Sequence, residues 1–189
     1  MKNIQSREQF DAAAQNLVGL KLVGVTYFEI ECDTEERSYL YQPQIGHFLD
    51  YGLEFRMADG QFRSFLWDAT FYPYGIGIFP HQAKIEISTA RQWIVNNTSE
   101  WTPLIDSTIE AVEVYWSWGP ELVADTKAHR ISYPQDLKLS FSAGQHIYIS
   151  ASQYLDSSET LFGMSDEILV VFDESSATRH CIGPHAKST

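Results

Sequence analysis

The stretch that decides the fold occurs in two versions, LEFRMADGQ at residues 53–61 and LKLSFSAGQ at residues 137–145. In both versions apolar residues alternate with polar ones, and a glycine, Gly60 or Gly144, is followed by glutamine. Alternation of this kind predicts a half-buried strand, and a glycine that can adopt positive φ predicts a hairpin turn after it. The two stretches therefore predict two similar β-hairpins, 84 positions apart.

The similarity extends to both sides of these hairpins. Upstream, LVGV at 22–25 resembles IEAV at 109–112 at an offset of 87, and downstream Ile85 and Ile87 fall on Leu169 and Val171 at an offset of 84. We interpret the pattern as an internal duplication within one compact domain of residues 1–189, with halves at 18–97 and 105–183. Chance similarity between alternating strands is the alternative interpretation.

Other local patterns predict the remaining elements. Ser6 and Gln9 match a capping box before apolar residues at helical spacing, which predicts a helix over residues 6–17. Strands are expected over residues 20–30, 83–88, 109–118 and 168–172, short helices after the strands near 88 and 174, and an aromatic loop over 71–80. The predicted fold is α+β and mainly β, with two four-stranded units packed as a sandwich or barrel-like sheet.

The length of the first hairpin loop is left open by the sequence. A two-residue loop pairs Met57 with Phe62, whereas a three-residue loop with a bulge pairs Met57 with Gln61. The choice decides which residues of the following strand are core, either Phe62 and Leu66 or Phe65 and Trp67.

Composition limits the classes of partner. The chain has 189 residues, of which 44% are hydrophobic and 14% aromatic, and this content is typical of a globular protein rather than a disordered one. Twenty-five acidic residues against 13 basic ones give a net charge of -12, which repels nucleic acid and anionic membranes. We therefore expect no nucleic-acid or membrane partner, and a protein partner that presents basic residues.

Two further observations concern location. The start MKNIQSREQF lacks the apolar segment of a signal peptide, and no apolar run approaches the roughly 18 residues of a membrane span. Cys32 and Cys181 are isolated and suit reduced thiols. A cytoplasmic location is the expectation.

Several clusters are candidate sites. Strand alternation over VEVYWSW at 112–118 puts Trp116 and Trp118 on one face and Glu113 and Tyr115 on the other. The two tryptophans either stack on a sugar or continue a core stripe. Tyr72 and Tyr74, in the aromatic loop, either contact a partner or pack on a sheet end.

Carboxylate pairs and possible metal ligands form a second group of candidates. Glu29 and Glu31 lie on one face of a strand, about 7 Å apart, and form a geometrically possible acid/base pair. The sequence HCIGPH at 180–185 matches no standard zinc spacing, and the chain contains no complete nucleophile or phosphate-binding motif. We expect neither a metal nor another cofactor, and whether the protein is an enzyme is uncertain, with the absence of motifs favouring a non-enzyme.

These observations favour a non-catalytic cytoplasmic protein-binding module, of the inhibitor or immunity type, for a basic partner. Its expected partner surface consists of Asp33, Glu35, Glu36, Asp166 and Glu167. The first alternative is a carbohydrate-like ligand binder or hydrolase that uses a carboxylate and aromatic cleft between the halves. The second is a homo-oligomeric structural subunit, for which a homodimer is the simplest form.

Overall fold

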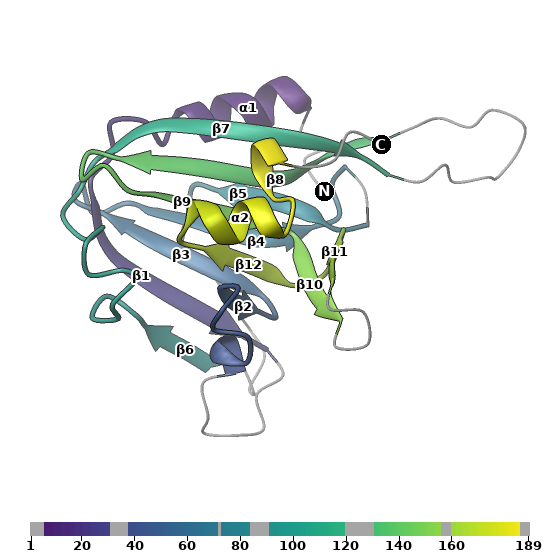
Figure 1. Ribbon diagram of the computed structural model, residues 1–189. Coiled ribbons are helices and arrows are strands. Elements are labelled where there is room, and N and C mark those ends of the chain that lie inside the picture. The colour runs from purple at the N-terminus through teal and green to yellow at the C-terminus, as the bar shows by residue number, and fades with distance from the viewer. Residues whose placement is uncertain are drawn as a thin grey trace, which may run out of the picture.

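The computed structural model describes residues 6–30, 38–71, 73–83, 91–119, 131–155 and 160–185. Within these ranges, two five-stranded antiparallel sheets pack face to face, and the mainly β, α+β architecture expected from the sequence is confirmed (Figure 1). The first sheet has the order β5-β4-β3-β1-β6, formed by β1 (Leu22–Glu29), β3 (Gly52–Met57), β4 (Phe62–Asp68), β5 (Gly75–Phe79) and β6 (Arg91–Ile94). The second has the order β2-β12-β9-β8-β7, formed by β2 (His47–Leu49), β7 (Ile109–Trp118), β8 (Ser132–Phe141), β9 (His146–Ser150) and β12 (Ile168–Val171).

The remaining elements cover the edges and one outer face of this sandwich. A separate hairpin joins β10 (Ser152–Leu155) to β11 (Thr160–Gly163), and two 3-10 helices, η1 (Ser38–Leu40) and η2 (Gly183–His185), lie before β2 and after α2. In Figure 1, α1 (Arg7–Gln15) lies along β7, and α2 (Glu174–Arg179) lies in front of the second sheet. In the part of the chain described, no helix is both long enough and apolar enough to cross a membrane.

The predicted capping box of α1 is confirmed. The Gln9 backbone N–H donates to the Ser6 hydroxyl at 3.3 Å, and the Ser6 N–H donates to the Gln9 side chain at 2.9 Å. These reciprocal bonds satisfy two donors that the first turn would otherwise leave unpaired. The buried face of the helix carries Phe10, which packs edge-to-face on Phe71 and Trp116 at centroid distances of 5.9 and 5.6 Å.

Both hairpins have the same three-residue loop. Met57 N–H donates to Gln61 O at 2.9 Å, and Phe141 N–H donates to Gln145 O at 2.8 Å. The loop glycines, at residues 60 and 144, have φ of 82° and 79°, the left-handed conformation that this loop needs. The three-residue alternative therefore holds, and it makes Phe65 fully buried and Trp67 half-buried on the core side.

The correspondence between the two units also includes a bulge and a junction. β1 bulges between Leu22 and Gly24 against β3, and β7 bulges between Ile109 and Ala111 against β8. Where the strands begin, Leu22 N–H donates to Ser107 O at 2.9 Å and Ile109 N–H donates to Leu20 O at 2.9 Å. Adding 87 to residue numbers 20 and 22 gives 107 and 109, so each of the two bonds is the counterpart of the other. The two units therefore meet about a local pseudo-twofold axis. Descent of the units from a duplication stays a prediction.

One apolar core fills the space between the sheets. Its fully buried residues include Phe55 and Phe65 from the first sheet and Leu139 and Ile149 from the second. A smaller cluster, with Tyr148 and Ala177 among its members, lies between the outer face of the second sheet and α2. A single shared core agrees with the sandwich arrangement expected from the sequence.

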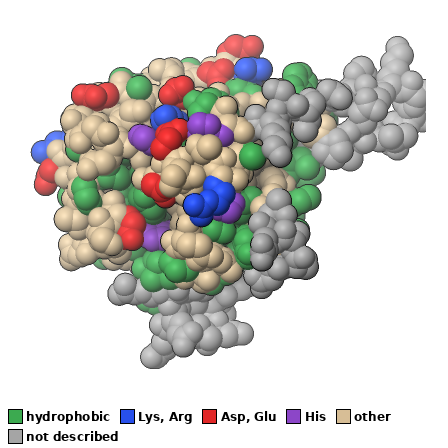
Figure 2. Space-filling view, in the orientation of Figure 1, with side chains coloured by type: hydrophobic (Ala, Val, Ile, Leu, Met, Phe, Trp, Pro, Cys, Tyr) green, Lys and Arg blue, Asp and Glu red, His purple; other side chains and the backbone are tan. Residues whose placement is uncertain are grey.

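A cluster of charged groups joins α2 to the second sheet. On the face shown in Figure 2, carboxylate and histidine side chains gather over α2. Glu174, the first residue of α2, accepts a hydrogen bond from the Tyr148 hydroxyl at 2.7 Å and lies 2.5 Å from His185 Nε2 and 2.8 Å from His146 Nε2. The bonds from Tyr148 and His185 lower the pKa of the Glu174 carboxyl to about 2. The helix expected near residue 174 is confirmed, and this cluster attaches it.

Three sequence expectations need correction. Residues 91–94, expected in a short helix, form strand β6, because they pair with β1 and cover its free edge. Residues 75–79, expected in a loop, form edge strand β5; a Cβ on Gly77 would lie 2.6 Å from the Phe79 ring, so glycine here permits close packing rather than marking a loop. Twelve strands are described rather than about eight. The expected strand over 83–88 lies mostly outside the described residues.

Candidate functional site

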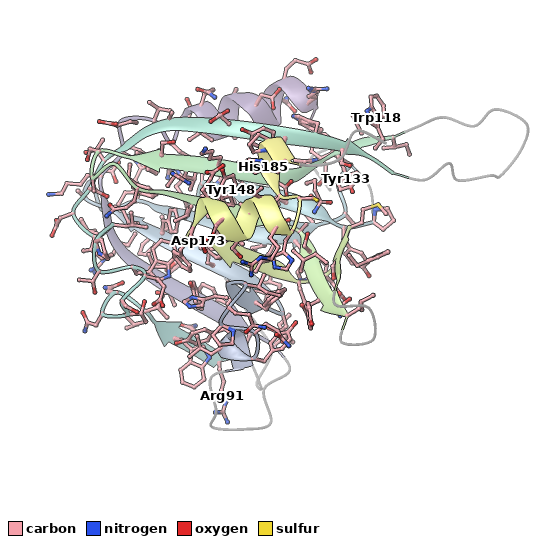
Figure 3. All side chains as sticks on the ribbon, in the orientation of Figure 1. Arg91, Trp118, Tyr133, Tyr148, Asp173 and His185 are labelled. Carbon is pink, nitrogen blue, oxygen red and sulfur yellow. The ribbon has the colours of Figure 1, made fainter. Side chains whose placement is uncertain are left out.

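Two of the pockets on the surface of the described chain lie at the ends of β1 and β7. Figure 3 shows Trp118 and Tyr133 close together where β7 ends and β8 begins, beside the larger pocket. The strand ends concerned are those remote from the pseudo-twofold junction, since β1 and β7 both begin there.

The smaller pocket, called here the acidic pocket, has a volume of about 400 Å³. Its described lining combines four carboxylates with three aromatic rings: Glu29, Asp50, Asp166, Glu167, Tyr41, Phe48 and Trp67, together with Ile30 and Gln153. These residues come from β1, β2, β4, β10 and the turn before β12. Residues far apart in the sequence therefore converge on one acidic cavity with aromatic walls.

Hydrogen bonds fix several walls of the acidic pocket. Glu29, only 2% exposed, accepts from the Trp93 indole N–H at 2.5 Å. The Asp50 carboxylate accepts from the Ile30 N–H at 2.8 Å, and its backbone carbonyl accepts from the Trp67 indole N–H at 3.0 Å. The indole of Trp67 is thereby held in place at the pocket wall.

Glu167 has a strongly perturbed pKa in the acidic pocket. Burial, together with the negative charges of Asp166 and Asp50, raises the pKa of its carboxyl to about 7, against a hydrogen bond from the Tyr41 hydroxyl that lowers it. Crowded carboxylates disfavour the charged form because each adds to the cost of ionising its neighbour. A cation placed in the pocket would reverse this effect.

The larger pocket, called here the aromatic pocket, has a volume of about 870 Å³. Its walls include five aromatic side chains from β7, β8 and β11, namely Tyr115, Trp116, Trp118, Tyr133 and Phe162. Among its described lining residues the only acid, base and histidine are Asp136, Arg7 and His180. Burial, followed by the charge of Arg179, lowers the pKa of His180 and so favours the neutral form of this imidazole.

A bulge in β8 builds the floor of the aromatic pocket. Tyr115 pairs with Asp136 and Trp116 with Pro134, so Gln135 is the extra residue. The Gln135 side-chain amide donates to Ala151 O at 2.8 Å, and its carbonyl accepts from Met164 N–H at 3.2 Å. This side chain joins β8 to the β10–β11 hairpin.

Asp136 lies beneath the same pocket and is 2% exposed. Its carboxylate accepts from the Gly183 N–H at 2.9 Å, which ties the C-terminal segment to β8. Burial raises the pKa of this carboxyl to about 6, against hydrogen bonds from Ser150, Gly183 and Gln135 that favour the charged form. A buried acid with a raised pKa beside a cavity is a recognised indicator of a functional site.

Backbone strain is also concentrated at the aromatic pocket. In the described chain three residues other than glycine have positive φ, and two of them, Met164 and Cys181, both at 58°, line this pocket. Left-handed conformations of such residues cost free energy and persist where the surrounding structure enforces them, often at functional sites. Cys181 is a free thiol.

The structure distributes the predicted site residues over the two pockets. Trp116 and Trp118 line the aromatic pocket with Tyr115, whereas Glu29, Asp166 and Glu167 line the acidic one. Neither pocket brings Glu29 together with Trp116 and Trp118, and the cleft expected between the halves stays a prediction.

The other predicted residues lie elsewhere. Glu113 lines neither pocket and accepts from the Tyr115 hydroxyl at 2.8 Å. Tyr74 packs on Trp67 at 5.5 Å, behind the acidic pocket wall. Tyr72, Glu31, Asp33, Glu35 and Glu36 lie outside the described residues.

The described residues contain no group of three or more His, Cys, Asp or Glu side chains placed to hold a metal ion. Of the residues in HCIGPH, His180 and Cys181 line the aromatic pocket, while His185 contacts Glu174. The expectation of a homodimer stays a prediction.

Comparisons with known proteins add no family. No protein-family model matches the chain, and searches of curated proteins and of solved structures found no match. The two pockets are therefore the features that indicate function.

Sequence reasoning missed Asp50, Trp67, Gln135, Asp136 and Phe162 as site residues. Asp136 carries a weak signal, because Gln135 and Asp136 place two adjacent polar residues at the entry to the apolar alternation of LKLSF. Adjacent polar residues in a strand indicate a change of face and hence a bulge. The other three residues lie in patterns typical of any half-buried strand or turn.

Proposed function

We propose that the protein is a non-catalytic binding module, of the inhibitor or immunity type, that docks a basic protein partner through its acidic pocket. The observation that carries the proposal is the convergence of four carboxylates and three aromatic rings on one cavity of about 400 Å³. The net charge of -12 adds a long-range attraction for a cationic partner and raises its rate of association. The proposal keeps the cytoplasmic location that the isolated cysteines favour.

An arginine side chain fits the chemistry of this pocket. Its planar guanidinium can bond carboxylates in a fork and stack on an aromatic face such as that of Trp67. Glu167 and Asp166 supply negative charge on one wall, and Asp50 supplies it on another. Lysine offers a point charge without the stacking face and should bind more weakly.

The raised pKa of Glu167 links binding to pH. At pH 7 a carboxyl with a pKa of about 7 is half protonated, and a bound cation favours its charged form. Binding therefore releases a proton, and affinity should rise as the pH increases from about 6 to about 8. A partner recognised only by its apolar surface would show no such dependence.

The test is a titration of the protein with the peptides Gly-Arg-Gly, Gly-Lys-Gly and Gly-Gln-Gly, followed by NMR and tryptophan fluorescence. We expect the arginine peptide to shift resonances of Trp67 and Glu167, the lysine peptide to do so less, and the glutamine peptide not at all. Glu167→Gln should weaken the arginine response about threefold to tenfold, because it removes one pocket charge. Glu110→Gln, at an exposed site on β7, is the matched control and should leave it unchanged.

Two results would contradict the proposal. One is equal binding of the arginine and glutamine peptides at low ionic strength. The other is an arginine response that Glu167→Gln and Glu110→Gln reduce equally, since that result would reflect overall charge rather than the pocket.

A further inference from the structure

We infer that the aromatic pocket is a second binding site, for a neutral carbohydrate, in which Trp118 and Phe162 stack on the sugar rings. This site is separate from the acidic pocket and does not depend on the proposed partner. Three features of the pocket lead to this inference step by step: exposed aromatic faces, a lining without net charge, and a fixed framework of hydrogen bonds.

The first step is the exposure of two large apolar side chains in a hollow. Trp118 is 52% exposed and Phe162 is 53% exposed, and both line the aromatic pocket, as Figure 3 shows for Trp118 at the end of β7. Trp116, the other tryptophan of this strand, is instead packed against Phe10 and Phe71. Flat aromatic faces turned to water suit the apolar faces of sugar rings, which leave their hydroxyls free for hydrogen bonds.

The second step is the charge of the lining. The described lining contains Arg7, which lies 3.7 Å from Asp11, and the buried Asp136, whereas the whole chain has a net charge of -12. A phosphate or polyanion needs several cationic or N–H donors, and a cation would prefer the acidic pocket. A neutral ligand is the class that this pocket accepts without an electrostatic cost.

The third step is the rigidity and polarity of the walls. The Gln135 side chain fixes the β10–β11 hairpin, and the strained residues Met164 and Cys181 hold the backbone around the hollow. Ser117 adds a hydroxyl group and Arg7 a guanidinium to the described lining. A purely apolar ligand would desolvate these groups without replacing their hydrogen bonds, whereas a ligand rich in hydroxyls replaces them.

The experiment is calorimetric and fluorescence titration with trisaccharides of glucose, galactose, mannose and N-acetylglucosamine, each to about 10 mM. We expect at least one trisaccharide to bind saturably and to perturb tryptophan emission. Trp118→Ala and Phe162→Ala should each weaken that binding about tenfold or more. Both side chains are half-exposed, so the variants should fold, and circular dichroism checks that they do.

The controls separate this site from the acidic pocket. Ile94→Ala changes an 80% exposed apolar residue on β6, outside the described lining, and should leave sugar binding unchanged. Glu167→Gln should also leave it unchanged, so failure of the peptide test and failure of the sugar test are distinguishable. The inference is overturned if no trisaccharide binds saturably, or if binding survives both Trp118→Ala and Phe162→Ala.

Discussion

Strands β1 and β7 start at the same pseudo-twofold junction and carry different chemistry at their far ends. Glu29 follows Leu22 by seven residues, and Trp116 follows Ile109 by seven, so the two side chains occupy corresponding places in the two units. Glu29 belongs to an acidic pocket and Trp116 to an aromatic pocket without clustered charge. The matching course of β1 and β7 determines where a pocket forms, but it does not determine which kind of ligand the pocket suits.

The difference arises from elements that the two units do not share. The acidic pocket takes walls from β2 and from the turn before β12, whereas the aromatic pocket takes walls from β11 and the C-terminal segment. The matching hairpin loops, at residues 58–60 and 142–144, lie at the opposite end of the units. The chemistry of each pocket is therefore determined by the elements that one unit has and the other lacks, and these elements lie at the strand ends remote from the hairpin loops.

The largest effect is expected for Asp136, and it shows whether the aromatic pocket disfavours a negative charge beneath it. The folded-state pKa of Asp136, about 6, lies above its ordinary 3.8, so its contribution to stability is complete below pH 3.8 and is lost as pH rises past 6. An asparagine side chain does not titrate, so the variant Asp136→Asn should not lose this stability. The difference in free energy of unfolding, variant minus wild type, should therefore increase by up to about 3 kcal/mol from about pH 4 to about pH 7. Urea denaturation at both pH values measures this.

A matched control for that comparison is Glu110→Gln, on the exposed face of β7, which should follow wild type at both pH values. If Asp136→Asn also follows wild type, the carboxylate is ionised without penalty. The aromatic pocket would then hold a stable negative charge, and its contrast with the acidic pocket would fail.

The next effect concerns how much the hydrogen bonds in the walls of each pocket contribute to the free energy of unfolding. Gln135→Ala leaves Met164 N–H without its partner and removes one of the two donors to Ala151 O, which keeps the Ser165 N–H at 3.4 Å. We expect a loss of about 2 kcal/mol of unfolding free energy. Gln153→Ala, in the acidic pocket, removes an acceptor for the Ser165 hydroxyl at 3.4 Å and should cost less than about 1 kcal/mol. Chemical denaturation measures both losses of unfolding free energy. Equal losses would show that hydrogen bonds stabilise the walls of the two pockets to the same extent.

The smallest effect concerns the cost of clustered charge in the acidic pocket. The pKa of Glu167 rises from 4.5 to about 7 on folding, so its ionisation lowers stability as pH increases through that range. Glu167→Gln should raise the free energy of unfolding at about pH 8 by about 1 kcal/mol, after allowance for solvent screening, and by little at about pH 5. Thermal denaturation at the two pH values measures the difference, and a loss of stability at pH 8 would contradict it.

Local signals predicted the parts of the fold that depend on local chemistry. The capping box at Ser6 and the glycine loops at Gly60 and Gly144 each act within a few residues, so the sequence predicted α1 and both hairpins. β5 was missed because Gly75 and Gly77 resemble loop glycines, although Gly77 permits a close contact with Phe79. β6 was missed because only its pairing with β1 makes it a strand.

The sites were less predictable than the fold. The sequence predicts Asp166 and Glu167 as partner residues from their charge alone, whereas the structure places them in one pocket with Glu29, well over a hundred positions away in the sequence. No local pattern specifies such a meeting, because it follows from the pairing of β2 with β12 within the second sheet and from the packing of that sheet on the first. Phe162 carried no signal for the same reason.

The pseudo-twofold junction also has a kinetic consequence. Each hairpin unit is built from neighbouring segments and can form early, whereas the bridge between Lys21 and Thr108 closes a loop of 87 residues. The pairing of His47 with Val170 spans a still longer stretch of chain. Since β2 supplies a wall of the acidic pocket, a newly made chain should gain that pocket only in the last stage of folding, after both units have joined.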